Sequence, residues 1–192
     1  MEAISTLLTS LGLGVGAGVN AYATFLVVGL LGRFGPAGLL PSEYSSWLSS
    51  TPALIVFGIL YCIEFVADKI PAIDHAWDVI HTFVRPLAGV VIALSAANPE
   101  MPTGLLVVAG ALSGGAALTS HVAKSSLRVG STATTGGAGN PILSVIEDIF
   151  AVVTAVLSIF LPVLVFLLLL FVVLPGALLL RSRMRRSSTV RP

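Results

Sequence analysis

The sequence of 192 residues is poor in charge, since Lys, Arg, Asp and Glu make up 10% of it and hydrophobic residues make up 56%. A soluble domain has roughly 45–50% apolar and about 25% charged residues. The single cysteine, Cys62, excludes an internal disulfide and is expected to serve packing. The net charge of +1 offers no strongly charged surface, and we expect no nucleic-acid partner.

The scarcity of charge takes the form of long uninterrupted runs. Asp, Glu, Lys and Arg are all missing from residues 3–32, 44–63, 86–99, 101–123 and 149–180. A helix that spans a bilayer needs about 20 mostly apolar residues, and these runs lack the alternation of barrel strands. The sequence therefore predicts an all-α integral membrane protein of the plasma (inner) membrane, with the lipid bilayer as its first partner.

About six transmembrane helices fit these runs. Residues 141–180 either fold into two spans near residues 158–162 or form one long tilted helix, because 40 residues exceed the bilayer thickness. The segment STATTGGAGN (131–140) is expected to be a flexible loop. The other four spans are expected over residues 4–32, 52–70, 74–97 and 104–123.

The distribution of basic residues decides between six and five spans. With six spans both termini are cytoplasmic, and nine of the ten Lys and Arg residues lie on or near that side. With five spans and the same tail, most basic residues between the spans would face outward. We therefore expect one transmembrane domain over residues 1–180, followed by a basic cytoplasmic tail over residues 181–192.

Two short segments suggest internal symmetry. ILYCIE (59–64) and ILSVIE (142–147) match as I-L-x-x-I-E, and each lies in the second span of its half. Halves of residues 1–98 and 99–180 would then form a 3+3 inverted repeat, as in many transporters. Short apolar matches also arise by chance, so this interpretation stays open.

The first run contains the glycine-rich segment GLGVGAGVNAYAT (12–24). Small residues four apart let membrane helices pack closely. The alternative is a broken helix that exposes backbone groups, with Asn20 at its middle.

The segment EFVADKIPAIDHAWDVIHTFVRP (64–86) concentrates six charged residues and two histidines in 23 residues. Asp74, Asp78, His81 and Arg85 are spaced 4, 3 and 4 residues apart, so they share one helix face. One interpretation is a solvated cytoplasmic stripe of Asp74, Asp78 and His81 at the start of an interfacial helix. The same three side chains could also bind a divalent metal, a question that the spacing leaves open.

Other charged residues fall inside the predicted spans, where an ionised side chain costs at least about 2.5–3.5 kcal/mol. We expect them to form a polar cluster near the cytoplasmic side, with Glu64 and Arg85 as a pair. The cluster is either a static salt-bridge network or a pathway for an ion, a proton or a substrate. Glu147 is the strongest candidate for proton or cation exchange. The residues assigned to the pathway are Asn20, Glu64, Asp68, Arg85, His121, Glu147 and Asp148.

Three segments resemble a bacterial membrane-protein family known as domain of unknown function 4126: NAYATFLVVGLLGRFG (20–35), EFVADKIPAIDHAWDVIHTFVRPLAG (64–89) and NPILSVIEDIFAV (140–152). The resemblance implies a compact multi-pass helical domain, and it supplies no substrate, cofactor or catalytic residue. The positions that it assigns to the family pattern are Asp68, Lys69, Pro71, Asp74, Trp77, Asp78, His81, Arg85, Glu147 and Asp148.

These features favour a transporter or channel for a small solute or ion. A non-transporting scaffold or assembly partner, with the charged segment as its docking face, is the alternative. A membrane enzyme that acts on a lipid carrier would need Asp74, Asp78 and His81 to converge. The chain lacks Ser-His-Asp, Cys-His and zinc patterns, so we expect no enzyme activity and no cofactor, and homo-oligomers are compatible with the sequence.

Overall fold

The computed structural model describes residues 2–36, 38–40 and 46–171, except for the side chains of residues 71, 72, 74 and 75. The expected basic tail, residues 181–192, lies outside the described residues. The described part is helical and contains no strand, and four of its helices are long and apolar enough to cross a bilayer. The chain is therefore an all-α membrane protein, as its composition predicts.

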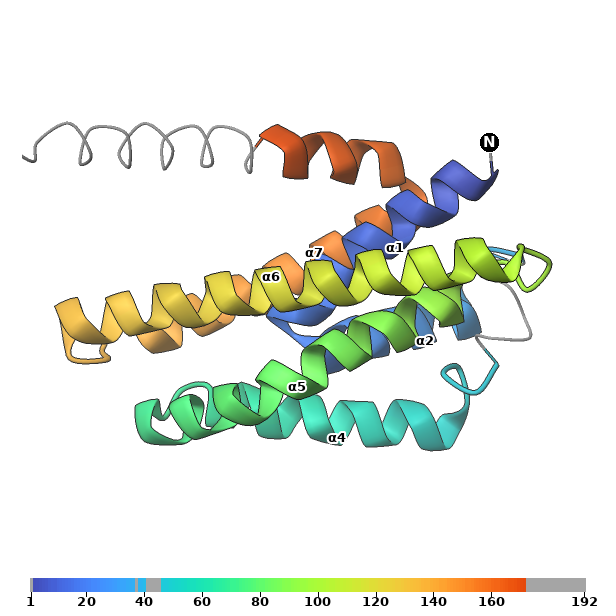
Figure 1. Ribbon diagram of the computed structural model, residues 1–192. Coiled ribbons are helices and arrows are strands. Elements are labelled where there is room, and N and C mark those ends of the chain that lie inside the picture. Colours follow the sequence, from blue (N-terminus) through green and yellow to red (C-terminus); the bar gives the residue numbers. More distant parts are fainter. Residues whose placement is uncertain (1, 37, 41–45, 172–192) are drawn as a thin grey trace, which may run out of the picture.

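Four helices run alternately back and forth along a common direction (Figure 1). They are α4 (Thr51–Ala67), α5 (Pro71–Ala96), α6 (Thr103–Thr135) and α7 (Asn140–Phe160). The first helix, α1 (Glu2–Val19), lies among them and packs most extensively against α6, α5 and α7. The helix α2 (Ala21–Phe34) packs against α4 and α7.

Residues 4–32 do not form the single span that the sequence predicts, because the helix breaks at Asn20. This residue has extended backbone angles, φ −146° and ψ 105°, between α1 and α2. Its side-chain oxygen accepts a hydrogen bond from the backbone N–H of Ala23 at 2.9 Å and so caps α2. The glycines just before it weaken α1, since each costs about 1 kcal/mol relative to alanine in a helix.

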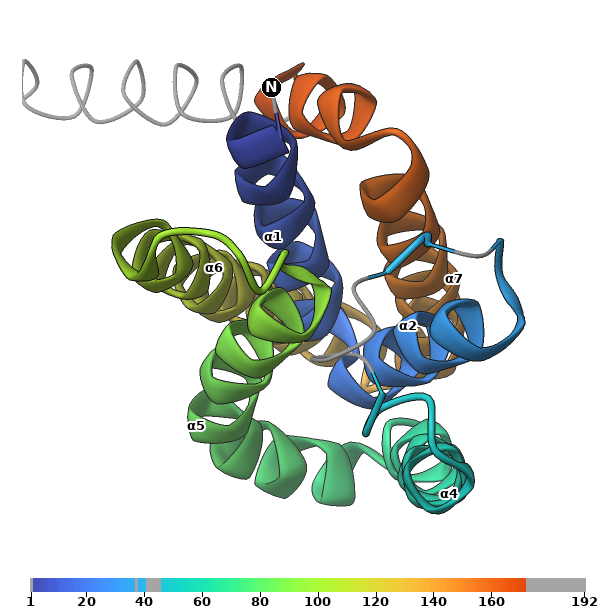
Figure 2. The same cartoon turned by 90° about the vertical axis from the view of Figure 1, so that its right-hand side faces the viewer.

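The chain also reverses direction at this break, so α1 and α2 form a V (Figures 1 and 2). The start of α1 and the end of α2 therefore lie at the same end of the bundle. Glu2 of α1, Leu39 after α2 and Asn98 after α5 line a common hollow at that end. Asp68 lies at the other end, bound to Arg128 of α6. A crossing over residues 4–32 would place the N-terminus and the 68–70 turn at the same end. This part of the six-span interpretation is wrong.

The helix boundaries on either side of the expected 131–140 loop and within the last apolar block are now defined. Helix α6 continues to Thr135, where Gly136 ends it in a left-handed conformation with φ 62°, so the expected loop shrinks to residues 136–139. The last apolar block breaks inside the expected 158–162 segment: α7 ends at Phe160 and a further helix covers Pro162–Phe171. The two halves of the expected inverted repeat, residues 1–98 and 99–180, differ in their first element. The first half begins with the broken pair α1 and α2, and the second half begins with the continuous helix α6.

Close helix packing accounts for much of the glycine content. A Cβ atom added to Gly14 or Gly18 would overlap the backbone of α6 at Ser113 or Ala117. Such contacts bring helix backbones together, as small residues do in membrane proteins. Pro86 inside α5 removes one backbone hydrogen bond, and α5 curves around the bundle (Figure 2).

Cysteine labelling tests the reversal at Asn20. In a Cys62→Ser background, Glu100→Cys should react with a membrane-impermeant thiol reagent from the side where an N-terminal epitope tag is accessible. Ala138→Cys should react only from the opposite side, because the 136–139 turn lies at the other end of the bundle. Both residues are exposed. If the tag and Ala138→Cys were reached from one side, residues 4–32 would have to cross the membrane.

Candidate functional site

The broken helix leaves backbone carbonyl groups of α1 open inside the bundle. The last carbonyls of a helix lack partners within it and carry a partial negative charge. The Gly18 oxygen accepts a hydrogen bond from Arg85 Nη1 at 2.8 Å, and the Val19 oxygen accepts one from Lys124 Nζ at 3.0 Å. Cationic side chains from α5 and α6 therefore donate hydrogen bonds to the open carbonyl groups at the end of α1.

Each of these cations also binds a carboxylate. Arg85 Nη2 lies 2.6 Å from Glu64 Oε1, and both side chains are fully buried. This confirms the pair expected from the sequence, with α4 supplying the acid and α5 the base. Lys124 Nζ lies 3.1 Å from Asp68 Oδ2, in the turn after α4.

Arg128 extends the network toward the end of the bundle. Its Nη2 atom donates to Asp68 Oδ2 at 2.8 Å, and its guanidinium also binds both carboxylate oxygens of Glu147. Burial would raise the pKa of the Asp68 carboxyl, but the charges of Lys124 and Arg128 outweigh burial and hold that pKa below its ordinary value. Glu147 is thus an ion-paired residue.

The two buried histidines are best described as neutral. His121 Nδ1 lies 2.8 Å from Arg85 Nη1, and a guanidinium can only donate, so Nδ1 must accept and the proton lies on Nε2. His81 Nδ1 is 3.8 Å from Glu64 Oε1, too far for a hydrogen bond. A buried imidazolium without a close carboxylate would carry most of the cost of an unpaired charge.

Asp148 differs from the other acids of the network in lacking an ion pair, although Glu64 Oε2 likewise has no hydrogen-bond partner among the described residues. Asn20 Nδ2 donates to the Oδ1 atom of Asp148 at 2.8 Å, which joins α7 to the helix break. Its Oδ2 atom is buried and has no hydrogen-bond partner within the described part of the chain. Ser144, one turn earlier on α7, likewise has a buried hydroxyl without such a partner. Asp148 as a whole is only 5% exposed.

Charge does not balance across the described network as a whole. Its buried basic side chains are Arg85, Lys124 and Arg128, its buried acids are Glu64, Asp68 and Asp148, and the partly exposed Glu147 adds a fourth carboxylate at its edge. Three cations face four carboxylates, and Asp148 is the acid for which the described residues supply no ion pair. An uncompensated charge at such a place is costly, so Asp148 needs a proton or a cation.

The two described members of the expected solvated stripe on α5, Asp78 and His81, instead face the bundle. His81 is 1% exposed and contacts the rings of Tyr22 and Trp77, whereas Val79, Ile80 and Phe83 on the opposite face are exposed. Asp78 is half-buried and accepts a hydrogen bond from Ser125 Oγ at 2.9 Å. The side chain of Asp74 lies outside the described residues. Among the described side chains, no three potential metal ligands gather.

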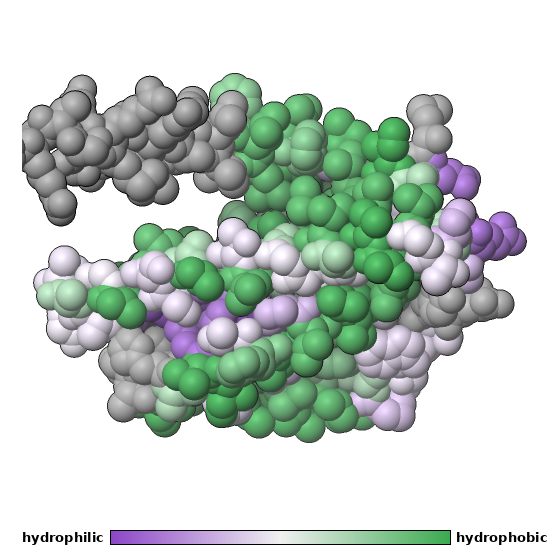
Figure 3. All heavy atoms as spheres, viewed as in Figure 1, coloured by the Kyte–Doolittle hydropathy of each residue, from purple (hydrophilic) through white to green (hydrophobic). Residues whose placement is uncertain are grey.

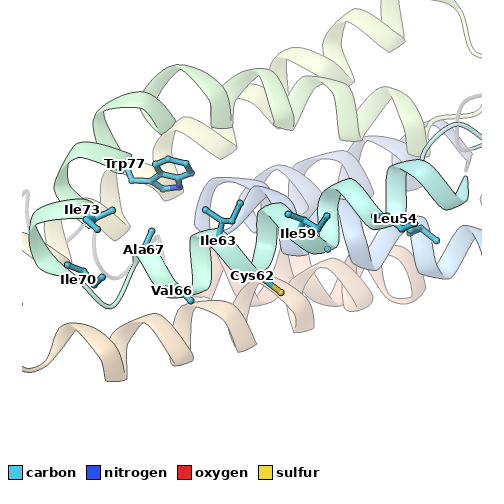
Figure 4. Close-up of a pocket in the computed structure, with 11 residues that line it drawn as sticks. Leu54, Ile59, Cys62, Ile63, Val66, Ala67, Ile70, Ile73 and Trp77 are labelled. Atoms are coloured by element: carbon cyan, nitrogen blue, oxygen red, sulfur yellow. The ribbon is translucent and has the colours of Figure 1, made fainter.

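On the face that Figure 3 shows, much of the surface is apolar. Hydrophilic side chains lie between α5 and α6, toward the end where α4 turns into α5, and again at the end near the N-terminus. An apolar groove runs along α4 to the start of α5, and Ile59, Cys62, Val66 and Trp77 line part of it (Figure 4). Cys62 is exposed there and does not serve interior packing. The groove contains none of the charged residues of the network.

The sequence identifies most of the network but underrates two of its members. The sequence-based interpretation places Lys124 beside the cluster, with His121 at the end of its span, and uses Arg128 mainly as a topology signal. Their spacing from His121, three and seven residues, places all three on one face of α6. That periodicity is the signal that could have assigned them to the interior.

A helical membrane protein with a buried ion-pair network around a broken helix is the class that these features define. The chain belongs to the family described as domain of unknown function DUF4126, which matches residues 7–182. Comparison with curated proteins and with solved structures finds no match in either set.

A double-mutant cycle tests the interior pair. Glu64→Gln and Arg85→Gln should each destabilise the detergent-solubilised protein, by about 3–5 kcal/mol, because each leaves its partner buried and unpaired. The double variant should lose less than the sum of the two, as measured by thermal or denaturant unfolding. Strict additivity would show that the two side chains do not interact.

Proposed function

We propose that this protein passes a small cation, the proton included, across the bacterial plasma membrane, with Asp148 as the carboxylate that exchanges it. The observation that carries this proposal is the buried carboxylate of Asp148, for which the described residues supply no ion pair. A purely structural network gains nothing from an unpaired acid. A site that binds and releases a cation needs one.

The position of Asp148 supports the same function. Many transporters build their sites where a membrane helix is discontinuous, because the free backbone and polar groups can meet the transported species there. Here the discontinuity lies between α1 and α2, and Asn20 at the break contacts Asp148 directly. Glu147, the acid favoured by sequence alone, is committed to Arg128 and lies 3.6 Å from Lys124.

Basic residues suggest how the protein is oriented. Lys69, Lys124 and Arg128 belong to the end opposite Glu2, whereas Arg33 lies near the end of α2. By the positive-inside rule, the end with Asp68 faces the cytoplasm and the start of α1 faces outward.

The alternative roles find less support in the geometry. A scaffold that docks through its charged segment needs those charges on the surface, but Glu64, His81 and Arg85 are buried. An enzyme built on Asp74, Asp78 and His81 needs them to converge, whereas Asp78 binds Ser125 and His81 packs against Tyr22 and Trp77.

Flux measurements on purified protein in lipid vesicles test the function. Wild-type vesicles should carry H⁺, Na⁺ or K⁺ down an imposed gradient faster than protein-free vesicles. Asp148→Asn should reduce that flux to the protein-free level, because the amide can neither bind a proton nor attract a cation. Asp78→Asn is the matched control, since it makes the same change at the half-buried rim, and it should keep wild-type flux.

Two results of the flux measurements would count against the proposal. Absence of flux for all three ions in vesicles that contain folded wild-type protein would refute it. Full flux in Asp148→Asn would remove Asp148 from the mechanism.

A further inference from the structure

Three buried side chains of α7 form a row between the 136–139 turn and the helix break. Asn140, Ser144 and Asp148 follow one another at intervals of four residues, so they share the buried face of the helix. Asn140 Oδ1, Ser144 Oγ and Asp148 Oδ2 are all buried, and none of the three atoms has a hydrogen-bond partner among the described residues. The row thus presents three oxygen atoms that can each accept a hydrogen bond from a ligand.

The V of α1 and α2 does not extend along this row. Its apex, Asn20, binds Asp148 directly, and both arms run from there toward the end of the bundle where α1 begins. Helices α6 and α7 continue past the apex in the other direction (Figure 1). The close approach of α1 to α7, where a Cβ atom on Gly12 would overlap Ser158, lies on the far side of Asp148. Packing of α1 therefore does not close the segment of α7 that precedes Asp148.

Helix α6 borders the row and carries it toward solvent. Arg128 binds Glu147, whose side chain is 11% exposed, and Asn140 Nδ2 donates to Thr132 Oγ1 at 3.0 Å. Thr132 is half-buried, and Asn140 directly follows the turn over residues 136–139, part of which is exposed. The row therefore begins beside a turn that solvent reaches and ends at the buried carboxyl group.

Water is the ligand that these oxygen atoms fit. A buried water typically makes about three hydrogen bonds to polar groups that would otherwise lack partners. Residues four apart on a helix are about 6 Å apart along its axis, close to the span of one water with two hydrogen bonds of about 2.8 Å each. A metal ion fits less well, because Ca²⁺ takes about 6–8 oxygen ligands and because Lys69 and Lys124 act on Asp148 electrostatically and would repel it.

Building on the cation function proposed above, with the proton as the cation, we propose that Asn140, Ser144 and Asp148 bind a file of water molecules that connects the Asp148 carboxyl group with the cytoplasm. When Asp148 releases its proton, the carboxyl O–H bond breaks and a new O–H bond forms on the first water. That water passes one of its own protons to the next, and the last water releases one to solvent at the 136–139 turn. The carboxylate that remains accepts the next proton.

Hydrogen–deuterium exchange at Asp148 tests the water file directly. The infrared carbonyl band of a protonated carboxyl group shifts when deuterium replaces the proton, and the band that Asp148→Asn removes belongs to Asp148. After transfer of the purified protein into D₂O, Ser144→Ala and Asn140→Ala should each slow this shift about tenfold, the effect of losing one hydrogen-bonding group from the file. Proton flux into vesicles, followed with a pH-sensitive dye trapped inside, should fall to the same extent.

Ser113→Ala is the matched control for Ser144→Ala. Ser113 is equally buried and its hydroxyl also lacks a partner among the described residues, but it lies on α6 against Gly14 of α1. Exchange and flux should therefore stay at the wild-type rate in Ser113→Ala. Ser144→Thr keeps the hydroxyl and should also keep both rates. Unfolding temperatures equal to that of the wild type would show that slower exchange reflects the lost polar group.

The results separate this inference from the function on which it rests. Wild-type exchange and flux in both Ser144→Ala and Asn140→Ala would overturn the water file, even if Asp148→Asn abolished flux and so supported the function. Slower exchange in both variants, with no flux of any cation through the wild-type protein, would support the file and refute the function. Flux of Na⁺ or K⁺ without proton flux would overturn the file as the path of the transported cation.

Discussion

The open carbonyl end of α1, buried inside the bundle, is the constraint on which the rest of the structure depends. Carbonyl groups without donors are costly in an apolar interior, and the negative end of a helix attracts cations. Arg85 and Lys124 supply both donors and charge. Those cations in turn require acids, which Glu64 and Asp68 provide. One broken helix thus accounts for much of the charge in a chain that has so little.

The ion-pair network and Asp148 differ in how their charges are compensated. Ion pairs around Arg85, Lys124 and Arg128 hold α4, α5, α6 and α7 together near the break, and removing one partner would leave an unpaired buried charge. Asp148 is bound by an amide rather than a cation, so it can change its charge without dismantling those pairs. In the proposed function, matched charges hold the interior together and Asp148 is the acid that changes its charge.

The sequence predicts the helical membrane class and the Glu64–Arg85 pair, because apolar length and charge within apolar runs are local properties. It offers the break near residue 160 as one of two alternatives. It does not reveal the reversal at Asn20, since hydropathy reports how apolar a segment is and not where it turns. The glycines of α1 were compatible with close packing or with a break, and the structure contains both. Glu147 and Asp148 are adjacent in sequence, and only the positions of Arg128 and Asn20 distinguish the paired acid from the unpaired one.

The described network of three cations and four carboxylates is neutral when Asp148, its one acid without an ion pair, holds a proton. Infrared spectroscopy of the purified protein at neutral pH can detect that proton, because a protonated carboxyl group has a carbonyl stretch that an ionised one lacks. We expect such a band in the wild-type protein and in Asp78→Asn, and its loss in Asp148→Asn. A wild-type spectrum without the band, or a band that persists in Asp148→Asn, would show that Asp148 does not hold the proton.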